Sequence, residues 1–208
     1  MDTTPNNRIL IVDDNCAIHA DFRRILGASP TADLDWAASE IFGDTASHTI
    51  SYELSFCTQG KEAVEAVSSS VASDKPFAIA FVDMRMPPGI DGVETIARMW
   101  QADPELQAVI CTAYSDQSWE QIIARLGRTD QFLVLKKPFE IIEACQIASS
   151  LARKWNLKRQ TELQMQEMAR LVESRAGELM ILNSEAFKTN DRLSKWQQSR
   201  VALAPTAA

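Results

Sequence analysis

Polar side chains follow four separate apolar stretches of the chain, each where the stretch ends. Three kinds of group occur there: carboxylates, a hydroxyl and an ammonium. In chain order they are Asp13 with Asp14, Asp83, Thr112 and Lys137, following residues 8–12, 77–82, 108–111 and 131–135. These types together suit the transfer of a phosphoryl group to a carboxylate.

The carboxylates would need a cation if they lie together. At 4 Å each pair repels by roughly 1–4 kcal/mol, depending on local screening. We therefore expect Mg²⁺ between Asp13, Asp14 and Asp83, because it takes oxygen ligands and leaves positions for phosphate oxygens. Asp83 would be the nucleophile, while the Thr112 hydroxyl and the Lys137 charge would contact the phosphoryl group.

The elements that must position these groups alternate between strand and helix. Short runs rich in β-branched and aliphatic residues predict strands, and segments of helical periodicity between them predict helices. The strands are expected at 8–12, 50–57, 77–82, 108–111 and 131–135, and the helices at 18–26, 60–71, 92–100, 118–126 (Ser118 as its cap) and from about 139. Such alternation predicts an α/β fold with a parallel sheet, in which right-handed crossovers bring all strand ends to one edge.

The chain is long enough for one domain and an appendage. We assign 1–7 to a disordered N-terminus, 8–154 to the α/β domain with an inserted connection at 28–49, 155–199 to a coiled-coil helix, and 200–208 to a disordered tail. The connection contains a weakly helical piece, 34–42, for which we expect a small helix packed on the domain edge.

The segment after Ala152 has helical periodicity and almost no turn residues. Alternating four- and three-residue steps trace a mostly apolar seam, which predicts a parallel, dimeric coiled coil. The seam consists of Met165, Met168, Val172, Arg175, Leu179, Leu182, Ala186, Thr189, Leu193 and Trp196. The alternative is a helix that folds back on the α/β domain, because Leu163, Leu171, Met180 and Phe187 lie off the seam.

Composition limits the remaining classes. A formal net charge of −7 argues against nucleic-acid binding, which favours a basic face. No apolar run reaches membrane-spanning length and the N-terminus lacks signal-peptide features, so we expect a cytoplasmic protein without a membrane partner. The four scattered cysteines are interpreted as small apolar residues.

Residues 8–154 resemble the receiver domain of two-component response regulators, a five-stranded, doubly wound, flavodoxin-like fold. The matching motifs are Ile-Val-Asp13-Asp14, Phe-Val-Asp83-Met-Arg-Met-Pro87, Asp91-Gly92, Cys-Thr112-Ala113 and Leu-Lys-Lys137-Pro138-Phe139. The resemblance implies that Asp83 accepts phosphate from a histidine kinase or phosphotransfer protein. It also implies that Asp14, Asp83 and the main-chain carbonyl of Arg85 bind Mg²⁺, that Asp13 acts through water, and that Thr112 and Lys137 relay the phosphoryl signal.

The sequence departs from that family in three places. The turn after Pro87 is one residue longer than in most receivers, and the connection after the first helix is also long. Most receivers carry Tyr or Phe three residues before the lysine, where this chain has Val134; Phe132 lies two residues earlier on the same strand face.

Several functions remain open at this stage. The first is a phosphoacceptor that signals through a homodimeric coiled coil; the second is a phosphorylation-insensitive dimerisation scaffold, motivated by Val134. The motifs also resemble receivers placed ahead of kinase or cyclic-di-GMP modules, so the chain could be the regulatory part of a larger protein. A Mg²⁺-dependent hydrolase is weaker, since haloacid-dehalogenase-type enzymes need Asp where Arg85 stands.

Overall fold

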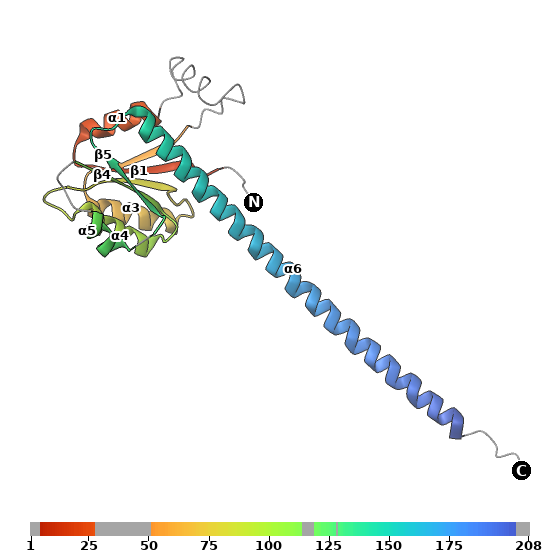
Figure 1. Ribbon diagram of the computed structural model, residues 1–208. Coiled ribbons are helices and arrows are strands. Elements are labelled where there is room, and N and C mark those ends of the chain that lie inside the picture. The colour runs from red at the N-terminus through yellow and green to blue at the C-terminus, as the bar shows by residue number, and fades with distance from the viewer. Residues whose placement is uncertain (1–4, 28–50, 114–118, 128, 203–208) are drawn as a thin grey trace, which may run out of the picture. The chain divides into compact units, whose positions relative to one another are not determined.

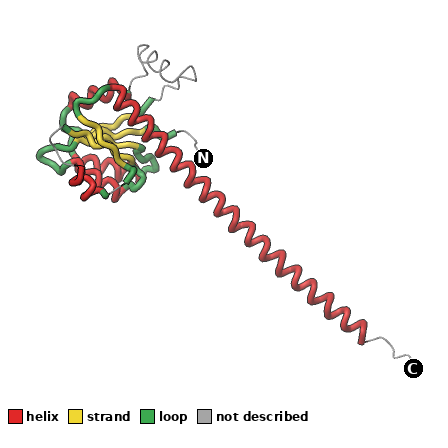
Figure 2. The backbone as a smooth tube through the Cα atoms, in the orientation of Figure 1, coloured by secondary structure: helices red, strands yellow, loops and turns green. Residues whose placement is uncertain are grey.

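The computed structural model describes residues 5–27, 51–113, 119–127 and 129–202 (Figures 1 and 2). The predicted connection at 28–49 and the predicted cap Ser118 lie outside these residues. Two compact units divide the chain, Met1–Lys158 and Arg159–Ala208.

The first unit alternates strand and helix, as expected. Its strands are β1 (Arg8–Val12), β2 (Glu53–Cys57), β3 (Ile79–Asp83), β4 (Gln107–Thr112) and β5 (Phe132–Lys136). Its helices are α1 (Cys16–Leu26), α3 (Gly60–Ala72), α4 (Gly92–Ala102) and α5 (Trp119–Leu126), and α6 (Ile141–Ala202) continues into the second unit.

All strand pairs are parallel, and the sheet order is β2-β1-β3-β4-β5. The flavodoxin-like, doubly wound fold predicted from the sequence is confirmed. Element boundaries differ by a few residues: α1 begins at Cys16 because the Asn15 side chain caps it by accepting from the Ala17 N–H. β2 begins only at Glu53, opposite Arg8, because β1 begins there.

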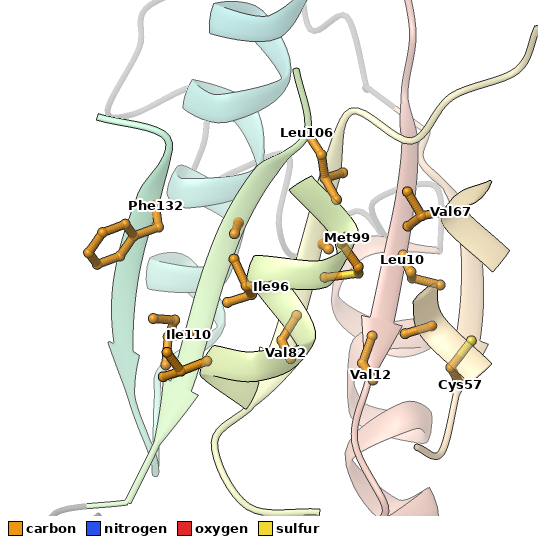
Figure 3. Close-up of a cluster of buried hydrophobic side chains, with 14 of the residues drawn as sticks. Leu10, Val12, Cys57, Val67, Val82, Ile96, Met99, Leu106, Ile110 and Phe132 are labelled. Carbon is orange, nitrogen blue, oxygen red and sulfur yellow. The ribbon is translucent and has the colours of Figure 1, made fainter. Parts of the chain in front are cut away.

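Two apolar layers cover the sheet, one on each face. Figure 1 shows the helices that bring them, with α3, α4 and α5 on one side of the sheet and α1 on the other. On one face, side chains of α3, α4 and α5 pack on alternate strand residues. Figure 3 shows Ile96 of α4 near Val82 and Ile110, and Met99 of the same helix near Leu10. On the other face, Phe22 of α1 packs with Phe81, and α6 contributes mainly small residues such as Ala144 and Ala148. The strands are therefore buried on both sides, which is why they read as continuous apolar runs.

Polar contacts hold both ends of the first unit. Asn6 donates its N–H to Asn156 Oδ1 at 2.7 Å and its side-chain amide to the Pro76 carbonyl at 3.0 Å. These bonds connect Asn6 to the domain, within the stretch 1–7 for which the sequence predicts disorder. Trp155 is buried and Lys158 pairs with Glu105, so the unit extends past the predicted limit at 154.

The cysteines divide by environment. Cys57 and Cys111 are buried and Cys145 is half-buried, and burial raises the pKa of Cys57 and of Cys111 to about 12. Cys16, at the start of α1, is exposed.

The second unit is helical from Arg159 to Ala202. Its described large apolar side chains are all exposed. Over the described residues, no helix combines the length and apolar character needed to cross a membrane.

Candidate functional site

Parallel pairing places the predicted site residues at one edge of the sheet. Val12 of β1 pairs with Val82 of β3, so Asp13 and Asp83, the next residues along the chain, stand on neighbouring strands. Asp83 pairs with Cys111, the residue before Thr112, and Thr112 pairs with Lys136, the residue before Lys137. The strand ends converge as predicted.

The ammonium of Lys137 lies between the carboxylates of Asp13 and Asp83, which are both largely buried. Its ammonium donates to Asp13 Oδ2 at 2.6 Å and to Asp83 Oδ1 at 2.5 Å. The sequence assigned Lys137 only to the phosphoryl group and expected a metal ion alone to neutralise the carboxylates. The structure instead gives Asp13 and Asp83 a shared cation from within the chain.

Backbone hydrogen bonds fix the segments that carry these groups. The N–H of Asp13 donates to the Cys57 carbonyl at 3.1 Å, and the N–H of Lys137 donates to the Thr112 carbonyl at 2.8 Å. The second oxygens of the carboxylates are held by the turns that follow: Asp13 Oδ1 accepts from the Asn15 N–H and Asp83 Oδ2 from the Arg85 N–H, both at 3.0 Å. Side-chain positions at the site are thus set by the main chain.

Burial and charge act against each other at the site. Burial disfavours the charged form of Asp83 and, helped by the nearby Asp13 carboxylate, raises the pKa of Asp83 despite hydrogen bonds from Lys137 and the Arg85 N–H. Burial would lower the pKa of Lys137, but its hydrogen bonds to Asp13 and Asp83 outweigh this, and the pKa of Lys137 is raised. The lysine therefore stays protonated between the carboxylates.

Two further predicted residues lie near this edge in different surroundings. Thr112 is buried, and its hydroxyl donates to the Ala113 carbonyl at 3.0 Å. Asp14 is exposed. Within the part of the chain that the structure describes, no group of three or more His, Cys, Asp and Glu side chains is arranged to hold a metal ion. The metal-binding role of Asp14 stays a prediction.

The lengthened turn after Asp83 is tightly packed. The Gly92 N–H donates to the Met84 carbonyl at 3.0 Å, and a Cβ on Gly92 would lie 2.3 Å from the Asp83 carbonyl oxygen. Only glycine fits there. Asp91 caps α4 by accepting from the Glu94 N–H at 2.7 Å.

Arg125 of α5 holds the end of that turn, a role that the sequence did not indicate. Its guanidinium pairs with Asp91 at 2.7 Å and with Glu94 at 3.1 Å. Partial burial alone would raise the pKa of Asp91, but the hydrogen bonds from Arg125 and the Glu94 N–H outweigh it, so the pKa of Asp91 is lowered. The contact spans 34 residues, so no local pattern could have revealed it.

Residues 45–149, just over half of the chain, match the family described as response regulator receiver domain. The chain belongs to the response regulator receiver family. It is also 30% identical over 138 residues to the sporulation initiation phosphotransferase F of Bacillus subtilis, an alignment that covers 66% of this chain and 87% of that protein. Receivers are the phosphoacceptor modules of two-component phosphorelay signalling.

Solved structures agree with the receiver fold. A structure titled adenylate cyclase from Rhodopirellula baltica superposes with a TM-score of 0.56 at 24% identity, covering 77% of this chain and 98% of that one. A CheY-like receiver domain protein from Methanospirillum hungatei gives 0.51 at 20% identity, covering 73% and 98%. At these identities the likeness shows the fold alone.

This receiver differs from the family pattern on β5. Val134 is half-buried against the α3–α5 side of the sheet, and Phe132 packs on the same side, as the sequence indicated. Phe132 is buried and its ring lies 5.7 Å from that of Trp119 in α5. The aromatic contact between β5 and α5 therefore involves position 132.

Proposed function

We propose that this receiver is a Mg²⁺-dependent phosphoacceptor, that Asp83 takes the phosphoryl group from a histidine kinase or phosphotransfer protein, and that the seam on α6 pairs two copies. One observation carries the proposal: Asp13 and Asp83, both largely buried, share the ammonium of Lys137 at the edge of the sheet. A carboxylate held there stands at the carboxyl end of a parallel strand, where folds of this kind bind their ligands.

The donor set fits Mg²⁺. Asp13, Asp14, Asp83 and the main-chain carbonyl of Arg85 would hold it through oxygen alone, as this ion prefers. Each oxygen of Asp13 and Asp83 accepts one hydrogen bond described above, and a carboxylate oxygen has about two acceptor sites. Bound Mg²⁺ would offset negative charge on the phosphoryl oxygens.

The side chains of the site would each have a separate role in the phosphoryl transfer. An Asp83 oxygen forms the new bond to phosphorus as the bond from phosphorus to the donor histidine breaks. The ammonium of Lys137 is in place to balance the added charge, and Asp13 holds that ammonium against the strand ends. The Thr112 hydroxyl would turn from the Ala113 carbonyl to a phosphoryl oxygen.

Acetyl phosphate tests the proposal without knowledge of the kinase. With Mg²⁺, we expect intact-protein mass spectrometry to show one added phosphoryl group on the wild type, and none after chelation or on Asp83→Asn. Asp74→Asn is the matched control, because Asp74 is exposed at the opposite edge and has a φ of 56° that asparagine tolerates. A wild-type protein that stays unmodified under these conditions would refute the phosphoacceptor role.

A second candidate is a dimerisation scaffold that does not respond to phosphorylation. Val134 favours it, since this half-buried side chain cannot make the aromatic rearrangement expected of most receivers. One measurement distinguishes the two candidates, in a variant that retains Trp119, beside Phe132, as its single tryptophan. If the protein is a phosphoacceptor that switches, we expect beryllofluoride with Mg²⁺ to change the fluorescence of Trp119. An unchanged spectrum, with beryllofluoride bound, would favour the scaffold.

A further inference from the structure

The start of helix α3 packs against the lengthened turn that follows Asp83. Because α3 begins at Gly60, just after the end of β2, it starts at the same edge of the sheet as the site. A Cβ on Gly60 would lie 2.7 Å from Ile90 Cγ1, in the turn, and 2.1 Å from Thr95 Oγ1, in α4. The main chain at the start of α3 is therefore in direct contact with the turn and with α4.

The side chain of Gln59 lies on the tip of this turn. Its Nε2 donates to the Pro87 carbonyl at 3.4 Å, and its Oε1 lies where a Cβ on Gly89 would come within 2.2 Å. The tip itself is closed by the Gly89 N–H, which donates to the Met86 carbonyl at 2.9 Å. The hydrogen bond to Pro87 is long, so the close approach to Gly89 is a second observation that the Gln59 carboxamide packs on the tip.

Helix α3 fixes the main chain from which this side chain extends. The Gln59 carbonyl accepts from the Ala63 N–H at 3.1 Å. The N–H and the hydroxyl of Thr58 both donate to the Glu62 carboxylate, at 2.8 and 3.3 Å. Because its main chain is held in this way, the Gln59 side chain restrains the tip relative to α3.

The restrained turn also carries Arg85. Its N–H donates to Asp83 Oδ2 at 3.0 Å, and its main-chain carbonyl is a proposed ligand of Mg²⁺. The residues on either side, Met84 and Met86, are 1% and 2% exposed. The main chain at Arg85 therefore lies between a hydrogen bond to the proposed phosphoacceptor and the tip on which Gln59 packs.

We propose that Gln59 is a positioning residue for phosphoryl transfer: by holding the tip of the turn, it limits movement of the main chain at Arg85 and so favours Mg²⁺ binding. The inference rests on the proposed function and adds a residue that acts through the turn. A ligand group that is already held in place loses less conformational freedom on binding. The contribution of one such hydrogen bond corresponds to about a two- to tenfold change in a dissociation constant.

Magnesium titration of the ¹⁵N-labelled full chain, followed by NMR without a phosphoryl donor, tests the proposal. We expect Gln59→Ala to raise the dissociation constant of Mg²⁺ by about two- to tenfold. Gln59→Met, which keeps the length of the side chain but has no N–H to donate, should also raise it. Gln101→Ala is the matched control, because Gln101 is an exposed glutamine at the other end of α4. This control should bind Mg²⁺ as wild type does.

Phosphorylation by acetyl phosphate gives a second readout. In Gln59→Ala, the Mg²⁺ concentration that gives half the maximal rate should rise by the same factor as the dissociation constant. The rate at saturating Mg²⁺ should equal that of wild type. A general loss of folding would instead lower the saturating rate and the thermal midpoint, so the two measurements separate positioning from destabilisation.

Gly89→Ala tests the contact itself, because the added Cβ would displace the Gln59 carboxamide. We expect it to weaken Mg²⁺ binding when Gln59 is present and to add little in Gln59→Ala. In that variant the nearest remaining atom to the Cβ is the Met86 carbonyl oxygen, at 3.3 Å. Effects that simply add would mean that the two residues act independently, and would overturn the role of Gln59 at the tip.

The outcomes separate this inference from the proposed function. A wild-type protein that does not bind Mg²⁺ would overturn the proposed Mg²⁺ dependence and the role of Gln59 with it. If wild type binds Mg²⁺ and both Gln59→Ala and Gln59→Met bind it equally well, only the positioning role of Gln59 is overturned.

Discussion

The carboxyl edge of the sheet and the helical segment 159–193 differ in whether their side chains find contacts within one copy of the chain. At the edge, each carboxylate oxygen of Asp13 and Asp83 accepts a hydrogen bond from the same chain. Along the helix, apolar side chains as large as Phe187 remain exposed. The first region is satisfied within a single copy, whereas in the proposed dimer the second is covered by a second copy. Substitutions that look alike should therefore have different effects in the two regions.

Leucine truncation should show the largest contrast. Leu106 is fully buried, whereas Leu171 is 54% exposed. We expect Leu106→Ala to lower the free energy of unfolding by about 2–5 kcal/mol, because it leaves a cavity. Leu171→Ala should change it by less than about 0.5 kcal/mol. Urea unfolding at low protein concentration measures the free energy of unfolding of both variants. Equal losses would contradict the proposed difference between the two regions.

Removing the shared cation should have the next largest effect. In Lys137→Ala, Asp13 and Asp83 would lose their common partner and repel each other, so we expect a loss of about 1–4 kcal/mol. Millimolar Mg²⁺ should restore part of this stability, because its charge would reduce the repulsion between the two carboxylates. Lys61→Ala, an exposed lysine on α3, is the control. A Lys137→Ala protein as stable as this control would contradict the role of Lys137.

Glycine substitution should change sign between the regions. A Cβ on Gly92 would meet the Asp83 carbonyl oxygen at 2.3 Å, whereas one on Gly177 would meet nothing within 4 Å. Gly92→Ala should therefore destabilise by about 1–3 kcal/mol. Gly177→Ala should add up to about 1 kcal/mol of helix stability. Thermal unfolding followed by circular dichroism measures the change in stability of each variant. A change of the same sign in both variants would contradict the expected difference between the two positions.

The smallest effect should come from Arg125→Gln, through its pH dependence. The pKa of Asp91 is lowered in the folded protein, so this pairing stabilises the fold above the ordinary pKa of about 3.9 and is lost as pH falls through the folded value. Because Arg125 and Asp91 are 38% and 36% exposed, solvent reduces the effect to about 0.2–1 kcal/mol. Stability measured from pH 7 to 3 should fall less steeply in Arg125→Gln; identical slopes would argue against the pairing.

Much of the first unit was predictable because its signals are local. Apolar runs that end in Asp13, Asp83 and Lys137 indicate buried strands, and parallel pairing then brings their ends together. Boundaries were less predictable, since the cap at Asn15 and the pairing of Arg8 with Glu53 decide where α1 and β2 begin.

Contacts between distant side chains were not predictable. The shared position of Lys137 depends on where the ends of β1, β3 and β5 meet, and its two hydrogen bonds span 124 and 54 residues. Arg125 with Asp91, and Asn6 with Asn156, are contacts of the same kind. Side-chain partners that far apart follow only from the assembled fold.

The central claim is that the phosphorylation site is complete within one copy of the chain, whether or not the helices pair. The most direct test treats wild type and Leu179→Glu/Leu182→Glu with acetyl phosphate and compares the added phosphoryl mass by intact-protein mass spectrometry. We expect the variant to sediment as single chains and to acquire one phosphoryl group at the wild-type rate, on Asp83 alone. A single-chain variant that fails to be phosphorylated would contradict the account, because it would mean that the site is completed by a second copy.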